Sequence, residues 1–255
     1  MRKIKLLLEY DGTAYQGWQV QKKGDTIQGI LENRILKVMG EQSKVIGASR
    51  TDAGVHALGQ VAAFRTESML DPETIKKALN ALLPQDIRIL NASEVRDSFH
   101  PRKGADRKTY FYIIANQRAM SAFLYKYTWR VPHSLEPESM KEASRVLIGE
   151  HDFSAFQGTG SGVKDPVRNI FSINIERLGS LGFMTARLNG NFIKIRIEAN
   201  GFLRHMVRNI VGTLVEIGRG RISYREMKSI LKSSNRRLAG PTAPSNGLFL
   251  ERIVY

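Results

Sequence analysis

At 255 residues the chain is long enough for one large domain or two smaller ones, each with a buried core. Its 39 Lys and Arg residues outnumber its 24 Asp and Glu residues, and the net charge of +15 favours an anionic polymer such as RNA over a neutral small molecule as the partner. No cysteine is present, which excludes disulfides, thiolate nucleophiles and cysteine-ligated zinc, and the five histidines lack the paired spacing of a metal site.

The first half of the chain alternates strand and helix patterns. Its expected elements are a strand at 3–10, a helix between Thr26 and Gly40, a strand at 60–65, a helix between Asp71 and Pro84, and a strand at 87–95. Thr26 and Asp71 are good N-caps, and Gly40 is a typical helix stop. The three leucines of the first strand form too short an apolar run for a signal peptide or a membrane span, so we expect a cytoplasmic protein.

The second half repeats this mixture of sheet and helix. Its expected elements are a strand at 108–115, a helix at 140–147, strands around 171–176 and 193–198, a helix at 203–217, a helix opened by a capping box at 223–226, and a strand at 248–255. The two middle strands alternate apolar and polar residues, which is typical of antiparallel sheets with one wet face. The glycine-rich segment 158–162 is expected to be a connecting loop.

These patterns predict an α+β protein. The two halves have similar proportions of sheet and helix, and we expect their mainly antiparallel sheets to join around a central basic cleft. The segment 98–108, which contains proline, glycine and several basic residues, is the expected connection. The predicted domains are therefore 1–104, which contains the acidic loop described next, and 105–255.

One loop, Gly47–Ala57, has an unusual composition: Asp52 lies among very small side chains, with Arg50 two residues before it. An aspartate in a glycine-containing loop is most often a turn or cap residue. Here Ala48, Ala53 and Gly54 would let a bulky substrate approach, and the arginine would accompany the carboxylate. The combination favours chemistry at a single ionised carboxylate, as in glycosidases.

Three other enzyme classes fit poorly. Gly12 and Gly17 have the spacing of a phosphate-binding P-loop, but Trp18 and Gln19 occupy the positions of its Lys and Ser or Thr. The glycines of 158–162 lack the last glycine of a dinucleotide-binding fingerprint and do not lie between a strand and a helix. A two-metal nuclease needs a second acid close to Asp52, and the closest in sequence are Glu41 and Glu67, which support such a site poorly.

Two further positions allow both a structural and a functional interpretation. Arg208 borders the apolar face of its predicted helix, where it either extends its head into water or keeps a buried carboxylate ionised. Tyr110 and Tyr112 share one strand face, where they either pack in the core or provide a flat ring for a base that is flipped out of RNA. The residues alone leave both questions open.

Several motifs together resemble the tRNA pseudouridine synthase A family in its compact bacterial form. They follow one another in order along almost the whole chain and are found at 10–13, 17–19, 47–57, 98–102, 108–112, 149–153, 199–212 and 243–248. The loop 47–57 is the most specific of them. The resemblance implies the pseudouridine synthase fold and conversion of uridine to pseudouridine at positions 38, 39 and 40 of the tRNA anticodon stem-loop. It also implies a homodimer that works without a metal, a nucleotide or any other cofactor.

The resemblance implies a role for each matching residue. Asp52 corresponds to the catalytic aspartate, Arg208 to its cationic partner, and Tyr110 to the tyrosine at the target uracil. Leu248 corresponds to an apolar residue near the base, and Arg50 to an RNA-facing arginine that helps to open the base stack. The isomerisation breaks the bond between N1 and C1′ and joins C5 to C1′, so one carboxylate suffices. It could attack the ribose, attack the ring or remove a sugar proton.

A competing interpretation is a non-catalytic tRNA-binding protein or RNA chaperone, because positive charge and aromatic rings would serve it equally well. A synthase with a shifted set of target uridines is a second alternative. A metal-dependent nuclease is a distant third. Mapping of pseudouridine in treated tRNA separates the first two, and activity in the presence of a chelator excludes the third.

Overall fold

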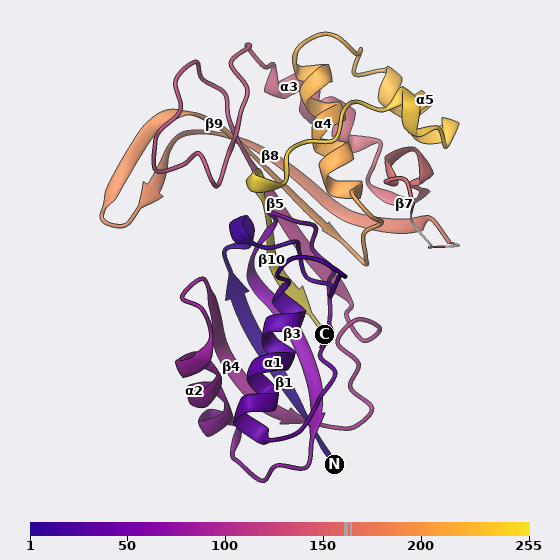
Figure 1. Ribbon diagram of the computed structural model, residues 1–255. Coiled ribbons are helices and arrows are strands. Elements are labelled where there is room, and N and C mark those ends of the chain that lie inside the picture. Colours follow the sequence, from indigo (N-terminus) through magenta and orange to yellow (C-terminus); the bar gives the residue numbers. More distant parts are fainter. Residues whose placement is uncertain (161–162, 164) are drawn as a thin grey trace. The chain divides into compact units, whose positions relative to one another are not determined.

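The computed structural model describes residues 1–160, 163 and 165–255 and confirms an α+β fold with mostly antiparallel strand pairing (Figure 1). The chain divides into two compact units, Met1–Lys108 with Phe249–Tyr255, and Thr109–Leu248. The predicted boundary at 104/105 lies within a few residues of this division, but it puts the last strand with the second half. The structure groups that strand with the first unit.

The first unit contains the strand order β4-β1-β3-β10, and the short strand β2 also pairs with β3. Its elements are β1 (Arg2–Tyr10), η1 (Gly12–Ala14), α1 (Ile27–Met39), β2 (Ile46–Gly47), β3 (His56–Thr66), α2 (Pro72–Leu82), β4 (Ile87–Val95) and β10 (Leu248–Val254). Strand β1 is antiparallel to both neighbours, whereas β10 runs parallel to β3. Every second residue of β1 is buried, which gives the sheet one apolar face.

Both helices of the first unit begin and end where their sequences predict. The side chain of Thr26 accepts a hydrogen bond from the Gly29 amide, and Gly40 ends α1 in the left-handed region. Asp71 accepts hydrogen bonds from the amides of Glu73 and Thr74, with Pro72 in the first turn of α2. Hydrogen bonds from Thr74 hold the pKa of the Asp71 carboxyl below its usual value.

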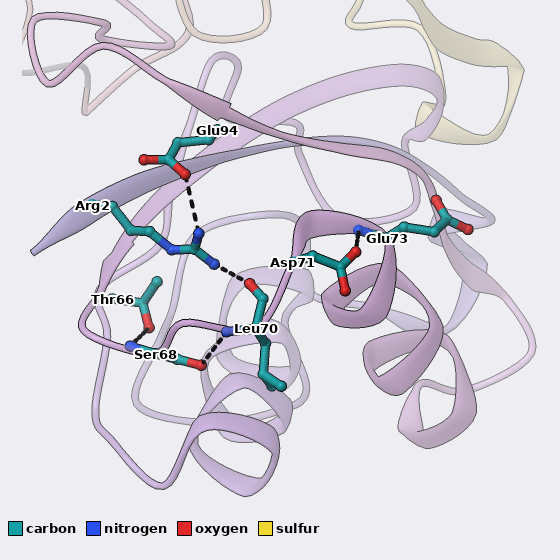
Figure 2. Close-up of polar contacts among 7 residues, drawn as sticks. All are labelled: Arg2, Thr66, Ser68, Leu70, Asp71, Glu73 and Glu94. Atoms are coloured by element: carbon teal, nitrogen blue, oxygen red, sulfur yellow. Dashed lines mark hydrogen bonds and ion pairs between the residues drawn. The ribbon is translucent and has the colours of Figure 1, made fainter.

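A polar cluster around Arg2 ties the start of β1 to the segment before α2 (Figure 2). The guanidinium pairs with Glu94 of β4 at 3.1 Å and also donates to the carbonyl of Leu70. Ser68 continues the chain of contacts, because its amide donates to Thr66 Oγ1 and its hydroxyl accepts from the Leu70 amide. The turn between β3 and α2 is thereby fixed by side chains.

The second unit contains the order β5-β9-β8-β7. Its elements are β5 (Arg107–Ala115), β6 (Trp129–Arg130), α3 (Pro137–Arg145), β7 (Gly149–Asp152), η2 (Ser154–Phe156), β8 (Val167–Phe183), β9 (Ala186–Ala199), α4 (Met206–Gly218), α5 (Glu226–Ser233), η3 (Arg236–Leu238) and η4 (Ser245–Gly247). Strands β8 and β9 form a long antiparallel hairpin (Figure 1). Part of the predicted 158–162 loop lies outside the described residues.

Three helix starts in the second unit differ from the sequence prediction. Helix α5 begins at Glu226, two residues later than a capping box with Ser223 as N-cap predicts, although the Glu226 side chain accepts from the Ser223 amide at 2.7 Å. Helix α3 begins at Pro137 rather than 140, because Glu136 caps it and proline suits the first turn. Helix α4 begins at Met206 rather than 203, because His205 has a left-handed backbone with φ of 59°. None of the described helices combines the length and the apolar character needed to cross a membrane.

Candidate active site

Asp52 lies in the loop that connects β2 to β3 in the first unit. Its side chain is half-buried, while Arg50 and Ala53 are exposed. Ala48 is fully buried, so it packs in the core and does not keep an approach to Asp52 open. The small residues of this loop therefore serve two purposes. Ala48 allows close packing in the core, and the small exposed side chain of Ala53 leaves the solvent-facing side of the loop unobstructed.

Two buried polar side chains of the sheet hold this loop from below. The Gln60 amide group donates to the Ser49 carbonyl at 2.8 Å, and its oxygen accepts from the Ser49 amide at 3.2 Å. The Tyr10 hydroxyl lies 2.8 Å from Thr51 Oγ1. Burial raises the pKa of Tyr10 to about 12, so the hydroxyl keeps its proton at neutral pH. The residues on both sides of Arg50 are thus anchored to β1 and β3.

Close backbone contacts hold the other side of the loop. Gly17 has a φ of 87°, and a Cβ there would lie 2.6 Å from the Thr51 carbonyl oxygen. The Trp18 amide donates to that same oxygen at 3.0 Å. A Cβ on Gly12 would meet the Val55 carbonyl oxygen at 2.0 Å. The two glycines with P-loop spacing therefore have a packing role: they let the segment 12–18 lie directly against the Asp52 loop.

Cationic side chains surround the same loop. Lys108 is buried and donates from Nζ to the Ala48 carbonyl at 2.8 Å, and Arg102 Nη2 donates to the Gly47 carbonyl at 3.2 Å. Burial, assisted by the charge of Arg50, lowers the pKa of the Arg102 guanidinium. Positive charge therefore accumulates beside Asp52, which favours binding of a polyanion there.

In the second unit, Arg208 lies in the first turn of α4 and is half-buried. Its Nε donates to the Ala243 carbonyl at 2.7 Å, and the Ala243 amide donates back to the Arg208 carbonyl at 3.1 Å. Part of the guanidinium is therefore tied to the chain before β10, so the side chain does not simply extend into water. The sequence interpretations had not included this arrangement.

The segment that holds Arg208, residues 239–243, is itself fastened to α4. Asn209 is fully buried, and its side-chain oxygen accepts from Arg236 at 2.9 Å and from the Thr242 hydroxyl at 2.6 Å. Arg236 Nη1 also donates to the Gly240 carbonyl at 2.9 Å. A Cβ on Gly212 would lie 1.7 Å from the Pro241 carbonyl oxygen, so only glycine permits this contact.

Sequence reasoning missed Arg236 and Asn209. The available signal was a polar side chain, Asn209, directly after Arg208 in a helix whose neighbouring positions are almost all apolar. A buried amide there needs partners, so it predicts a polar network. The identity of the partner could not be predicted, because Arg236 is 27 residues away in an otherwise exposed segment.

The tyrosines of β5 are both buried, with Tyr110 6% exposed and Tyr112 fully covered. The Tyr110 ring meets Phe202 edge to face, with 5.2 Å between ring centroids. The Tyr112 hydroxyl donates to the Pro244 carbonyl at 2.8 Å. Burial raises the pKa of Tyr112 strongly, and the charge of Arg208 opposes that shift. Tyr112 therefore supports the chain beside Arg208, while Tyr110 lies next to the loop before α4.

The structure distributes the five residues selected from the sequence between the two units. Asp52 and Arg50 lie in one loop of the first unit, whereas Tyr110, Arg208 and Leu248 belong to the second. Leu248 is buried, at the start of β10. Among the described residues, no group of three or more His, Cys, Asp or Glu side chains is placed to hold a metal ion.

Comparisons with known proteins give a consistent result. The model of a family described as tRNA pseudouridine synthase matches residues 7–102 and 143–255, which include all five selected residues except Tyr110. The tRNA pseudouridine synthase A of Thermodesulfovibrio yellowstonii is 46% identical over 255 residues, and that of Thermoanaerobacter sp. (strain X514) is 47% identical over the same length. A tRNA pseudouridine synthase A 2 of Clostridium perfringens is 46% identical. Each alignment covers 100% of both chains.

Proposed function

Because this chain belongs to the tRNA pseudouridine synthase family, we propose that it converts uridine to pseudouridine at positions 38, 39 and 40 of the tRNA anticodon stem-loop. The observation that supports this most strongly is the full-length similarity to relatives with that name, combined with a firmly held Asp52 loop among cations. The net charge of +15 suits a tRNA substrate.

In the proposed reaction the bond between N1 and C1′ of the uridine breaks, the uracil turns, and C5 bonds to C1′. C5 then loses its proton and N1, which carries none while it is bonded to C1′, gains one, so the product is an isomer and no electrons are gained or lost. No redox cofactor or energy source enters this balance. The Asp52 carboxylate performs the central step, as a nucleophile toward C1′ or C6 or as the base that removes a sugar proton.

The other residues bind and orient the substrate in this proposal. Arg208 is the cationic partner of the aspartate in this proposal, and the hydrogen bond from its Nε to the Ala243 carbonyl fixes the guanidinium. Tyr110 stacks on the flipped uracil, Leu248 provides an apolar contact near the base, and Arg50 helps to separate the target from its neighbours. Exposure of Arg50 beside Asp52 is consistent with contact to RNA.

Flipping the base costs a few kcal/mol of stacking, and phosphate contacts from Lys and Arg side chains offset that cost. We further propose that the enzyme works in the cytoplasm as a homodimer, as the family resemblance implies. A Tyr110→Phe variant separates two roles of this side chain. An unchanged rate would leave only ring stacking, and a lower rate would assign a part to the hydroxyl.

The proposal is tested by incubating the protein with unmodified tRNA transcripts and mapping pseudouridine at every uridine of the anticodon arm. We expect modification at positions 38, 39 and 40, in the presence of a chelator and without any added cofactor. Binding of tRNA with no pseudouridine formed would instead identify a binding protein or chaperone. Modification at other uridines would retain the reaction and refute the proposed target set.

A further inference from the structure

The motif at 98–102 contains one arginine, Arg102, which has no role in the reaction proposed above. The motif lies between β4 and β5 and belongs to the first unit, like the Asp52 loop. Pro101 is buried, Arg102 is half-buried and Lys103 is exposed. Arg102 therefore lies at the boundary between the core and the solvent, where its side chain can contact both.

Side chains of the same unit hold the backbone on both sides of Arg102. His100 Nδ1 accepts hydrogen bonds from the amides of Arg102 and Lys103, each at 3.1 Å. The Tyr255 hydroxyl donates to the Pro101 carbonyl at 2.8 Å. These hydrogen bonds fix the turn, so the start of the Arg102 side chain is in place before any ligand binds.

The guanidinium of Arg102 contacts the start of the Asp52 loop and uses little of its hydrogen-bonding capacity there. Its Nη2 donates to the Gly47 carbonyl at 3.2 Å, and it has no other hydrogen bond or ion pair among the residues that the structure describes. An arginine side chain has five N–H donors. Most of them stay available here, and a guanidinium with several available donors is well suited to an anion with several oxygen atoms.

A second guanidinium, that of Arg50, lies near the first. The charge of Arg50 helps burial to lower the pKa of Arg102, so the two cations are close enough to repel each other. Arg50 is exposed, and within the described part of the chain neither arginine forms an ion pair with a carboxylate. An anion bound by both groups would offset their repulsion, and a phosphate has the charge and the oxygen atoms to accept from both.

We propose that Arg102 and Arg50 together bind one phosphate group of the tRNA backbone next to the target uridine. The inference rests on the proposed function and adds the contact that places the nucleotide at the Asp52 loop. Gly47 and Arg50 belong to the short segment that leads to Asp52. A phosphate held at this segment fixes the backbone on one side of the flipped base, which brings the ribose to the carboxylate.

The first test measures how tRNA affinity depends on salt for wild type, Arg102→Gln, Arg102→Lys and Lys103→Gln. We expect Arg102→Gln to weaken binding about tenfold and to reduce the slope of log affinity against log salt by about 0.7 to 0.9, the contribution of one phosphate contact. Arg102→Lys should keep the slope, because an ammonium group also binds phosphate. Lys103→Gln is the control for general charge, since it removes a cation from the same turn, and its slope should not change.

The same measurement separates the proposal from a purely structural role, in which Arg102 only holds Gly47. A structural role would lower the melting temperature of Arg102→Gln and leave the salt slope as in wild type, and this result would overturn the proposal. Equal changes of slope in Arg102→Gln and Lys103→Gln would also overturn it, because they would show a general effect of charge.

The second test changes the RNA, so it includes wild-type protein and does not depend on the folding of one variant. Each tRNA has one target uridine and a single neutral methylphosphonate linkage, placed in turn at every position flanking that uridine. We expect one linkage to weaken binding by wild type about tenfold and binding by Arg102→Gln very little, because that variant has already lost the contact. Arg50→Gln replaces an exposed side chain and should lose sensitivity to the same linkage.

Two outcomes of the second test would overturn the proposal: a wild type that tolerates every neutral linkage, or equal losses in wild type and both variants at every linkage. The test measures affinity and does not require turnover. Wild type that binds tRNA without forming pseudouridine would refute the proposed function, while a loss of affinity at one linkage, absent from both variants, would still support the phosphate contact.

Discussion

The two units position their proposed functional side chains in different ways. In the first unit, the loop around Asp52 is fixed through its backbone: glycines allow close approach, and Gln60 and Tyr10 bond to the residues before the aspartate. In the second unit, Arg208 is fixed through its own side chain, whose Nε donates to Ala243. A reacting carboxylate needs oxygen atoms available to substrate, so the backbone is the better anchor for it. A guanidinium has five N–H donors, so it can use one of them to bind the backbone that positions it.

The contrast predicts that the reaction rate depends on the shape of the side chain at position 208 as well as on its charge. Arg208→Met should lower kcat about 100-fold with little change in tRNA affinity, because it removes a cation that acts mainly on the transition state. Arg208→Lys should restore only part of the rate, since it keeps the charge but not the planar group that donates to Ala243. Single-turnover rates and filter binding measure the two effects. Equal losses in rate and affinity would reduce Arg208 to a phosphate contact.

Gly17→Ala tests the backbone anchor of the first unit. We expect it to lower the free energy of unfolding by about 2–3 kcal/mol, because it combines a positive φ with a clash against the Thr51 carbonyl. Gly40→Ala is the control, since Gly40 also has a positive φ but a Cβ there would meet nothing within 4 Å. It should cost about 1 kcal/mol and leave activity unchanged. Denaturant unfolding of both variants isolates the clash, and equal losses would contradict the proposed contact.

Arg236→Met tests the anchor of the second unit. It should lower kcat about tenfold, because segment 239–243 would no longer be held to Asn209 and Ala243 would no longer fix Arg208. Arg237→Met is the matched control, since it removes the same charge from an exposed neighbour. In an Arg208→Met background, Arg236→Met should have no further effect on kcat. Additive losses would show that Arg236 does not act through Arg208.

Tyr10→Phe should have the smallest effect, a loss of about 1 kcal/mol from the hydrogen bond to Thr51. It also changes the pH dependence of stability. The pKa of Tyr10 is about 12 in the folded protein and 10 as a free side chain, so the unfolded chain releases this proton first. Stability is therefore complete below pH 10 and falls as the pH rises toward 12. Unfolding measured between pH 8 and 11 should show a shallower decline for Tyr10→Phe than for wild type, and parallel curves would contradict the assignment.

Local signals in the sequence predicted most elements of the first unit. The caps Thr26 and Asp71 and the stop at Gly40 determine the ends of α1 and α2 within a few residues, so the pattern alone was sufficient there. The start of α4 could not be predicted in the same way. A Cβ on Gly158 would lie 2.7 Å from the His205 ring, and this distant contact accompanies a left-handed backbone that the local pattern does not signal.

In the candidate site, too, some features follow from local sequence and others depend on contacts between distant segments. Asp52 was selected from the composition of its own loop, whereas the position of Arg208 beside an apolar helix face left its role open and only the family resemblance assigned it one. Two of their supports come from far along the chain: Tyr10, 41 residues from Thr51, for the loop, and Arg236, 27 residues from Asn209, for the helix. The grouping of β10 with the first unit likewise depends on parallel pairing with β3. Contacts of this kind depend on packing between distant segments, and periodicity and spacing do not encode which segments meet.

The central claim is that the carboxylate of Asp52 carries out the reaction and is not needed for binding. It is tested most directly by comparing wild type with Asp52→Asn, which keeps the size of the side chain and removes its charge. Tritium release from tRNA labelled at C5 of uridine measures turnover, and filter binding measures affinity. We predict unchanged tRNA affinity with no detectable release. Release at a rate near that of wild type would contradict the account.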